Sequence, residues 1–162
     1  MTNDRQNIRR CLKNYPKDTD KILLKDYLFN ILSNITQSKS MLRRQHDERM
    51  FNNKMKIIRD IFNKRMNNKK VIKIPKEHLI NFYNFNENST VKNLIHSHSI
   101  LVIPRKFISE KNAEQDILDL IVILSQIVAF MHFKISVKKR PNCAINYMTK
   151  SVSENNDRRT VF

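Results

Sequence analysis

The chain of 162 residues contains no glycine, and this absence constrains its fold more than any other feature of the sequence. Glycine is the residue that enters left-handed backbone conformations without steric cost. Two-residue β-hairpins usually turn on Asn-Gly or Asp-Gly, so a β-rich chain of this composition would have to turn on Asn or Asp alone. Helices joined by polar loops tolerate the absence best, and we therefore expect a mainly α-helical protein.

The missing glycine also excludes several functional motifs. Phosphate-binding loops of the G-x-x-x-x-G-K-[ST] and G-x-G-x-x-G kinds need glycine where the backbone approaches the ligand, and the G-x-S-x-G elbow needs it for a strained turn. A chain with 0 Gly contains none of these motifs. We therefore expect a protein that is not an enzyme and that uses no cofactor.

One segment, residues 113–133, is apolar almost all the way round and reads AEQDILDLIVILSQIVAFMHF. Its run without Lys, Arg, Asp or Glu reaches only from Leu120 to Phe133, whereas a membrane span needs about 20 apolar residues. Acidic residues precede the run and basic residues follow it, which complements a helix dipole. The segment predicts a central core helix and argues against a membrane span.

Three other segments have the spacing of amphipathic helices. Residues 1–14 predict a short basic helix that ends before Pro16, and residues 18–35 predict a second helix with a broad apolar face. In residues 40–70 the apolar positions recur in steps of three or four, which places them on one stripe facing the core. The members of this stripe are Phe51, Met55, Ile58, Phe62 and Met66.

Shorter elements are expected between and after these helices. Two β-branched runs, residues 71–74 and 99–103, each end at a proline followed by a base, and they predict short strands or extended connectors. Residues 134–137 predict a third strand. Two short helix candidates, residues 77–85 and 90–97, lie between the first two runs.

The length of the chain indicates one domain with a sizeable core. We predict a mainly α fold, a helical bundle formed by residues 1–140 around the central apolar helix 113–133. The prediction leaves room for two or three short strands. Residues 141–162 turn polar, and we expect them to form a loosely ordered tail.

The charge of the chain favours a polyanionic partner. It carries 31 Lys and Arg against 15 Asp and Glu, a formal net charge of +16. Residues 39–70 alone hold eleven of the bases and three of the acids. Exposed bases on a helix are often no more than a solvated face, but here few acids compensate them at i,i+4 spacing.

We therefore predict a non-catalytic basic protein that binds DNA or RNA through phosphate contacts from the helix of residues 40–70. A second basic cluster at residues 138–140 could extend that surface if the fold brings the two together. The predicted contact residues are Arg43, Arg44, Arg49, Lys54, Lys56, Arg59, Lys64, Arg65, Lys69, Lys70, Lys138, Lys139 and Arg140.

The alternative is a helical protein–protein interaction or adaptor module, such as a viral accessory protein, whose charge serves solubility or an acidic partner. Such a module needs an exposed apolar groove, and flexible methionines suit its lining. The candidate lining residues are Met41, Met50, Phe51, Met55 and Met66. The abundance of Asn and Ile indicates an AT-rich genome. Attachment of the basic helix to a membrane surface is a third hypothesis, and a small-molecule substrate is not expected.

Metal-ligating residues are few. His96 and His98 stand two apart, but no spacing enforces a third ligand from Cys143, His78 or His132, so we interpret them as part of a polar loop and expect no metal. The only other cysteine is Cys11, and there is no C-x-x-C pair. The acids Glu114, Asp116 and Asp119 are explained by the start of the central helix.

The amino-terminal sequence MTNDRQNIRR is polar and has no apolar core of a signal peptide, which predicts an intracellular protein. The tetrapeptide Lys138-Lys139-Arg140-Pro141 resembles a nuclear-import signal and would direct the protein to the nucleus. The same bases equally suit the carboxyl end of a helix, in which case we expect a cytoplasmic protein.

Overall fold

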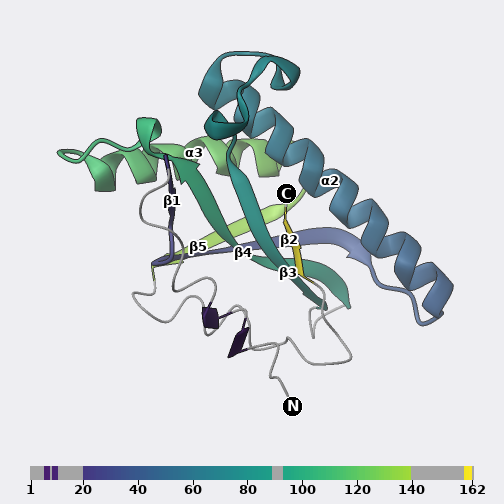
Figure 1. The fold of residues 1–162 in the computed structure, drawn as a ribbon. Helices are drawn as coiled ribbons and strands as arrows, with labels where there is room; N and C mark the ends of the chain where they lie inside the picture. Colours follow the sequence, from purple (N-terminus) through teal and green to yellow (C-terminus); the bar gives the residue numbers. More distant parts are fainter. Residues whose placement is uncertain (1–5, 8, 11–19, 89–92, 140–158, 162) are drawn as a thin grey trace.

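The computed structural model describes residues 6–7, 9–10, 20–88, 93–139 and 159–161. In these residues two long helices lie on the same side of an antiparallel β-sheet (Figure 1). The strands are β1 (Lys21–Leu23), β2 (Tyr27–Thr36), β3 (Asn81–Asn88), β4 (Leu94–Pro104), β5 (Lys134–Lys139) and β6 (Arg159–Val161). The helices are α2 (Met41–Asn67) and α3 (Ala113–Phe130), with 3₁₀ turns η1 (Val71–Lys73), η2 (Lys76–His78) and η3 (Arg105–Phe107).

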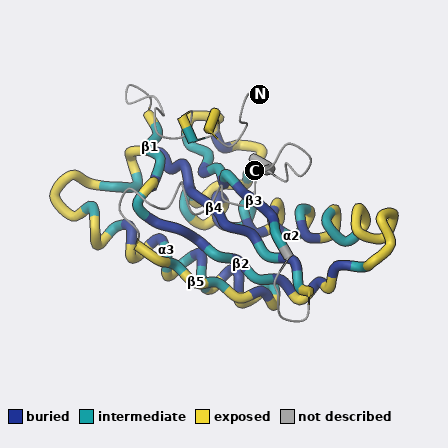
Figure 2. Tube along the Cα trace, turned by 90° about the horizontal axis from the view of Figure 1, so that it is seen from below, coloured by how far each residue is buried: buried dark blue, intermediate teal, exposed yellow. Residues whose placement is uncertain are grey.

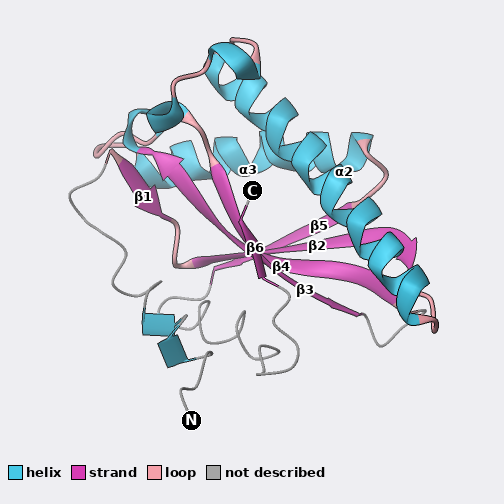
Figure 3. Ribbon diagram, turned by 45° about the vertical axis from the view of Figure 1, so that its right-hand side comes forward, coloured by secondary structure: helices cyan, strands magenta, loops and turns pink. Residues whose placement is uncertain are grey.

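The sheet has the order β5-β2-β4-β3-β6. Strand β1 pairs with the carboxyl end of β4, on the same side of β4 as β2. All of the pairings are antiparallel. The succession β2-α2-β3-β4-α3-β5 with this strand order is the β-α-β-β-α-β arrangement of split β-α-β folds. The prediction of a mainly α helical bundle is therefore wrong, and the protein is a mixed α/β structure (Figure 3).

The main error concerns residues 18–35, which we predicted as a helix and whose described part forms β1 and β2. Along β2, Phe29 and Ile31 face the helices, while Leu28 and Leu32 face the other side of the sheet. Because β2 lies between β4 and β5 and carries apolar residues on both faces, its sequence lacks the alternation of a half-exposed strand. A strand with apolar residues on both faces is easily mistaken for a helix.

Asparagine and histidine occupy the left-handed turn positions where glycine is the usual residue. Asn68 ends α2 with φ 51°, Asn93 precedes β4 with φ 53°, and His132 follows α3 with φ 61°. These residue types enter the left-handed region several-fold more often than other non-glycine residues. The absence of glycine therefore does not prevent a β-rich fold, contrary to our expectation.

The structure confirms some of the other predicted short elements and changes the type of the rest. Residues 99–103 lie inside β4 and residues 134–137 inside β5, which confirms two of the three predicted strands. The run 71–74 instead contains η1, and the helix candidate 77–85 is mostly β3. Of the candidate 90–97, residues 94–97 belong to β4.

Helix α2 buries the stripe that its sequence predicts. Phe51, Met55, Ile58 and Phe62 are fully buried, and Phe62 packs edge-on against Phe82 of β3. The first turns of α2 extend past the sheet, and residues 41–46 are all exposed (Figure 2). One face of the helix therefore packs against the core, and its long outer face does not.

Helix α3 begins at Ala113 as predicted but is not surrounded by other helices. It buries Ile117, Leu120 and Leu124 on one face, while Leu118 and Val122 on its outer face are 47% and 55% exposed. It is a surface helix that packs on the sheet and on α2, and the prediction of a central core helix is wrong. Among the described residues, no helix is both long and apolar enough to cross a membrane.

Two predicted segments lie mostly outside the described residues. Of the predicted helix at residues 1–14, residues 6–7 and 9–10 are described and are helical. Of the predicted tail at residues 141–162, only residues 159–161 are described, and they form β6 against β3.

Candidate functional site

The two histidines that we placed in a polar loop lie on β4, in the middle of the sheet, so that interpretation is wrong. Because successive side chains of a strand alternate between faces, His96 and His98 point to the same side. In the register of β3 and β4, Glu87 stands directly opposite His96. The pairing of His98 with Asn30 on β2 places the cluster on the face of the sheet opposite α2 and α3, called the helix-free face below because neither of these two helices packs on it.

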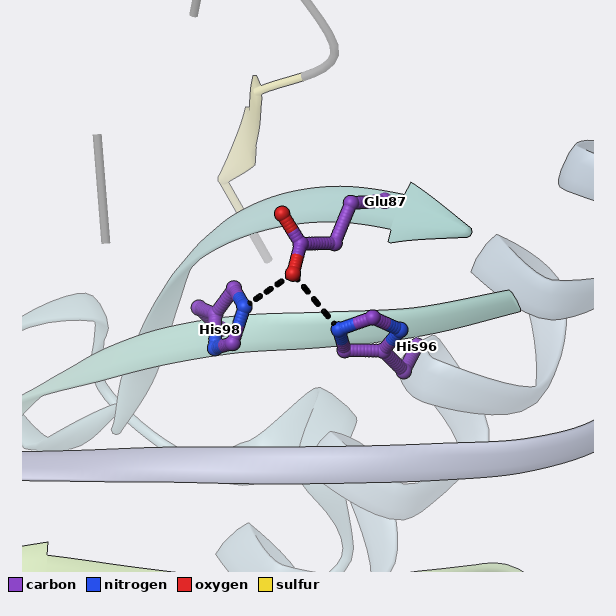
Figure 4. Close-up of side chains that lie close together, drawn as sticks. All are labelled: Glu87, His96 and His98. Atoms are coloured by element: carbon purple, nitrogen blue, oxygen red, sulfur yellow. Dashed lines mark hydrogen bonds and ion pairs between the residues drawn. The ribbon is translucent and has the colours of Figure 1, made fainter. Parts of the chain in front are cut away.

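Glu87 joins the two imidazoles through one carboxylate oxygen. Its Oε1 atom lies 2.7 Å from Nε2 of His96 and 2.5 Å from Nε2 of His98 (Figure 4). The side chains of Glu87, His96 and His98 are 21%, 16% and 5% exposed, so water has little access to these hydrogen bonds. Hydrogen bonds from His96 and then from His98 hold the pKa of Glu87 far below its usual range. Glu87 is therefore an ionised carboxylate whose one oxygen is shared by the two imidazoles.

The second ring nitrogens of the two histidines have different surroundings. Nδ1 of His98 is hydrogen-bonded to the side-chain oxygen of Asn30, and because that oxygen is an acceptor, Nδ1 carries a proton. Nδ1 of His96 is buried and has no hydrogen-bond partner among the described residues. Asn30 therefore fixes the orientation of the His98 ring, whereas the one hydrogen bond of the His96 ring within the described residues is to Glu87.

A pocket of about 350 Å³ adjoins the two histidines. It lies on the helix-free face of the sheet, over β4, β2 and β5. Its polar lining comprises Asn30, His96, His98, Lys134, Ser136 and Lys138. The two lysines are exposed, and Lys134 and Lys138 point to the same side because they are four residues apart on a strand. The pocket combines positive charge with imidazoles and a carboxylate behind them, which suits an anion or a metal with an anionic ligand.

The basic residues predicted on the helix are distributed around α2 and the turn after it. Within the described part of the chain, no acid pairs with Arg49, Lys56 or Lys64 of its exposed outer face. Lys54 instead lies 5.4 Å from the ring centre of Phe133, and Arg59 pairs with Asp60 at 2.8 Å. The exposed members of the predicted set are Arg43, Arg44, Arg49, Lys56, Lys64, Arg65, Lys69 and Lys70.

The second predicted cluster is divided by the sheet. Lys138 lines the pocket on the helix-free face, whereas Lys139 points to the helix side, where its Nζ lies 3.8 Å from Glu114 and 5.7 Å from the ring centre of Tyr27. Arg140 lies outside the described residues. Since α2 covers the other face of the sheet, Lys138 does not extend the surface of α2.

The proposed groove of the adaptor hypothesis is also changed by the fold. Phe51 and Met55 are fully buried, while Met41 and Met50 are 75% and 41% exposed. The exposed apolar residues of α3 were not among the candidates, because we expected residues 113–133 to form a central core helix. Among the described residues, the exposed large apolar side chains therefore lie on α3, along α2 and on η1, where Ile72 is 91% exposed.

Sequence reasoning missed Glu87 altogether. The i,i+2 spacing of His96 and His98 matches the period of a strand, and the β-branched run after them could have indicated one. No pattern in the sequence, however, brings Glu87 opposite His96, because that contact depends on the register of β3 against β4. Cys143 lies outside the described residues, and His78 and His132 are not part of the cluster.

Comparison with known proteins adds no functional information. The chain matches no protein-family model, and neither curated proteins nor solved structures show a significant similarity to it.

Proposed function

We propose that the protein binds nucleic acid without catalysis and that phosphates contact the outer face of α2. The observation that carries the proposal is the row formed by Arg49, Lys56 and Lys64. All three are exposed and have no acidic partner among the described residues. Their side chains stand on the face of α2 opposite the buried stripe, so that the sheet does not obstruct a ligand.

The three acids of α2, Asp47, Glu48 and Asp60, are too few to neutralise its eight Lys and Arg residues. Asp47 accepts hydrogen bonds from the backbone N–H and the hydroxyl of Ser38, at 2.9 and 2.7 Å. Asp60 accepts two hydrogen bonds from its neighbour Arg59. The outer face consequently retains an excess of positive charge, as the release of counterions from phosphates requires.

The dimensions of α2 suit a duplex. A helix of 27 residues is about 40 Å long, and one turn of B-DNA is about 34–36 Å. The helix-free face of the sheet is less suited to single strands, which are bound by stacking of bases on exposed aromatic rings. On that face Phe85 is buried and Tyr83 is only partly exposed. We therefore place the contacts on α2 and propose no reading of base sequence.

The test is a fluorescence-anisotropy titration of the full chain against random duplex DNA, single-stranded DNA and structured RNA at about 50 and 200 mM salt. The variant Arg49→Gln/Lys56→Gln/Lys64→Gln should bind all sequences more weakly, and its log affinity should fall less steeply with log salt, by up to about three units of slope. The matched control Lys25→Gln/Lys73→Gln/Lys111→Gln removes the same charge from exposed residues elsewhere.

Two results would contradict the proposal. Weak binding of the unmodified chain to all three nucleic acids at low salt would show that the protein does not function in nucleic-acid binding. Equal losses in the α2 variant and in the control would show that overall charge, and not the face of α2, determines the affinity.

A second candidate function, protein–protein interaction, is favoured by the outer face of α3. Leu118 and Val122 are one turn apart and about half exposed, so they form an apolar stripe on a helix that ends in the 77% exposed Phe130. A photo-crosslinking residue at position 122 should capture a specific protein that the variant Leu118→Gln no longer captures. Capture that is unaffected by this variant would exclude the stripe as the contact.

A further inference from the structure

We propose that Glu87, His96 and His98 form a binding site for one divalent first-row transition metal ion of the Zn²⁺ type. One carboxylate oxygen and two imidazole nitrogens converge there, and the three ligand atoms lie within 4.8 Å of one another. The proposal is independent of the nucleic-acid contacts on α2, because the cluster lies on the opposite face of the sheet.

The distances fit a metal after a small adjustment. The two Nε2 atoms lie 2.5 and 2.7 Å from the carboxylate oxygen. Around a tetrahedral Zn²⁺ with bonds of about 2.0–2.1 Å, neighbouring ligand atoms are about 3.3 Å apart. Side-chain rotations that move the ligand atoms by less than about 1 Å are therefore sufficient to reach this geometry. The ion would displace the two Nε2 protons, as metal binding to imidazoles generally does.

The donor atoms select the class of metal. Two imidazoles and one carboxylate are a donor set of zinc sites with an open fourth position and of the two-histidine, one-carboxylate sites of Fe²⁺. Ca²⁺ and Mg²⁺ prefer ligand sets made of oxygen alone. Since His96 and His98 also line the pocket, water or a small anion could complete the coordination from that side.

The scaffold is suited to hold these ligands. All three side chains come from β3 and β4, which are adjacent strands inside the sheet, and ligands on strands are placed more precisely than ligands on loops. Asn30 accepts the hydrogen bond from Nδ1 of His98, and a metal-ligating histidine almost always donates its other ring N–H in this way. His96 lacks this support among the described residues. We therefore expect metal binding to be more sensitive to substitution of Asn30 or His98 than of His96.

The experiment titrates the metal-free full chain with Zn²⁺ in competition with a chromophoric chelator, and with Co²⁺ monitored by its visible absorption. We expect one ion per chain, a visible spectrum of low-coordinate Co²⁺, and no binding of Mg²⁺. The variants Glu87→Gln and His98→Gln should weaken Zn²⁺ binding at least 100-fold. Asn30→Ala should weaken it about 10–100-fold. The control His46→Gln changes an exposed histidine of α2 outside the cluster and should bind as the unmodified chain does.

The proposal is overturned if the unmodified chain binds Zn²⁺ no more tightly than His98→Gln, or if His46→Gln loses the ion and Glu87→Gln keeps it. Circular dichroism of each variant identifies any that fail to fold. A second measurement covers that case: saturating Zn²⁺ should raise the unfolding temperature of the unmodified chain, and an unchanged temperature overturns the site as well. Tighter binding of Fe²⁺ than of Zn²⁺ under anaerobic conditions would support the site and identify its metal.

Discussion

The side chain of Asn63 in α2 pairs with the backbone of Ile80 in the way that a neighbouring strand would. Its Oδ1 accepts the N–H of Ile80 at 2.7 Å, and its Nδ2 donates to the carbonyl of Ile80 at 3.0 Å. Asn63 is only 1% exposed, and Ile80 immediately precedes β3. The pair connects the carboxyl half of α2 to the start of β3, which carries Glu87, and thereby helps to fix where β3 enters the sheet.

Replacing Asn63 by leucine should therefore destabilise the fold. The variant leaves the N–H and C=O of Ile80 buried without partners, and each such group costs about 1–3 kcal/mol. Urea denaturation followed by circular dichroism measures the loss as a lower midpoint. The control Asn67→Ala removes longer hydrogen bonds, from Nδ2 to the carbonyls of Asn63 and His78 at 3.1 and 3.2 Å and from Lys106 to Oδ1 at 3.1 Å. Because Asn67 is less buried and Ile80 keeps its partner, this variant should cost less. Equal midpoints for the two variants would contradict this role of Asn63.

Ser33 has a comparable role in β2, where the pairing with β4 shifts register between Leu32 and Thr36. Its hydroxyl donates to the carbonyl of Ile95 at 2.6 Å and accepts the N–H of Ile35 at 3.1 Å, so it satisfies groups that the irregular ladder leaves unpaired. Ser33→Ala should lower the free energy of unfolding by about 1–3 kcal/mol. Ser136→Ala, at an exposed position of β5, should change it by less than about 0.5 kcal/mol. A Ser33 variant as stable as the Ser136 variant would show that the hydroxyl is dispensable.

The residues that the sequence places correctly are those whose arrangement depends only on local spacing. The stripe from Phe51 to Phe62 and the start of the apolar helix at Ala113 follow from the period of a helix, which is independent of the rest of the chain. Residues 27–36 are different, because their two apolar faces make sense only between β4 and β5. The same limit applies to the candidate site, where the distance between Glu87 and His96 depends on strand register.

The amino-terminal end of α3 supplies a pH-dependent contribution to stability. Oδ2 of Asp116 accepts hydrogen bonds from the backbone N–H and the hydroxyl of Ser109, both at 2.8 Å. The backbone hydrogen bond first, and then the hydroxyl, lower the pKa of Asp116 in the folded protein. A carboxyl whose pKa is lower in the folded state stabilises the fold above its unfolded pKa of about 3.9 and loses that contribution as the pH falls below it.

Asp116→Asn should therefore be less stable than the unmodified chain at neutral pH, and the difference should shrink as the pH falls below about 4. Thermal unfolding of both proteins between neutral and acidic pH measures this convergence. Asp119→Asn is a suitable control on the same helix, since Asp119 is exposed and accepts one hydrogen bond from the side chain of Gln115. A difference for Asp116→Asn that is constant over the whole pH range would refute the linkage.

The division of the basic residues between two faces gives a direct test of where phosphates bind. Lys134 and Lys138 line the pocket on the helix-free face, and α2 lies on the other face of the sheet. If phosphates contact α2, Lys134→Gln/Lys138→Gln should leave the salt dependence of nucleic-acid affinity unchanged, because no released counterion is associated with these lysines. Its affinity should fall no further than that of a variant lacking the exposed Lys25 and Lys111, which carries the same net charge. A decrease of the slope by about two units in the Lys134/Lys138 variant would instead place the phosphates over the pocket, beside Glu87 and the two histidines.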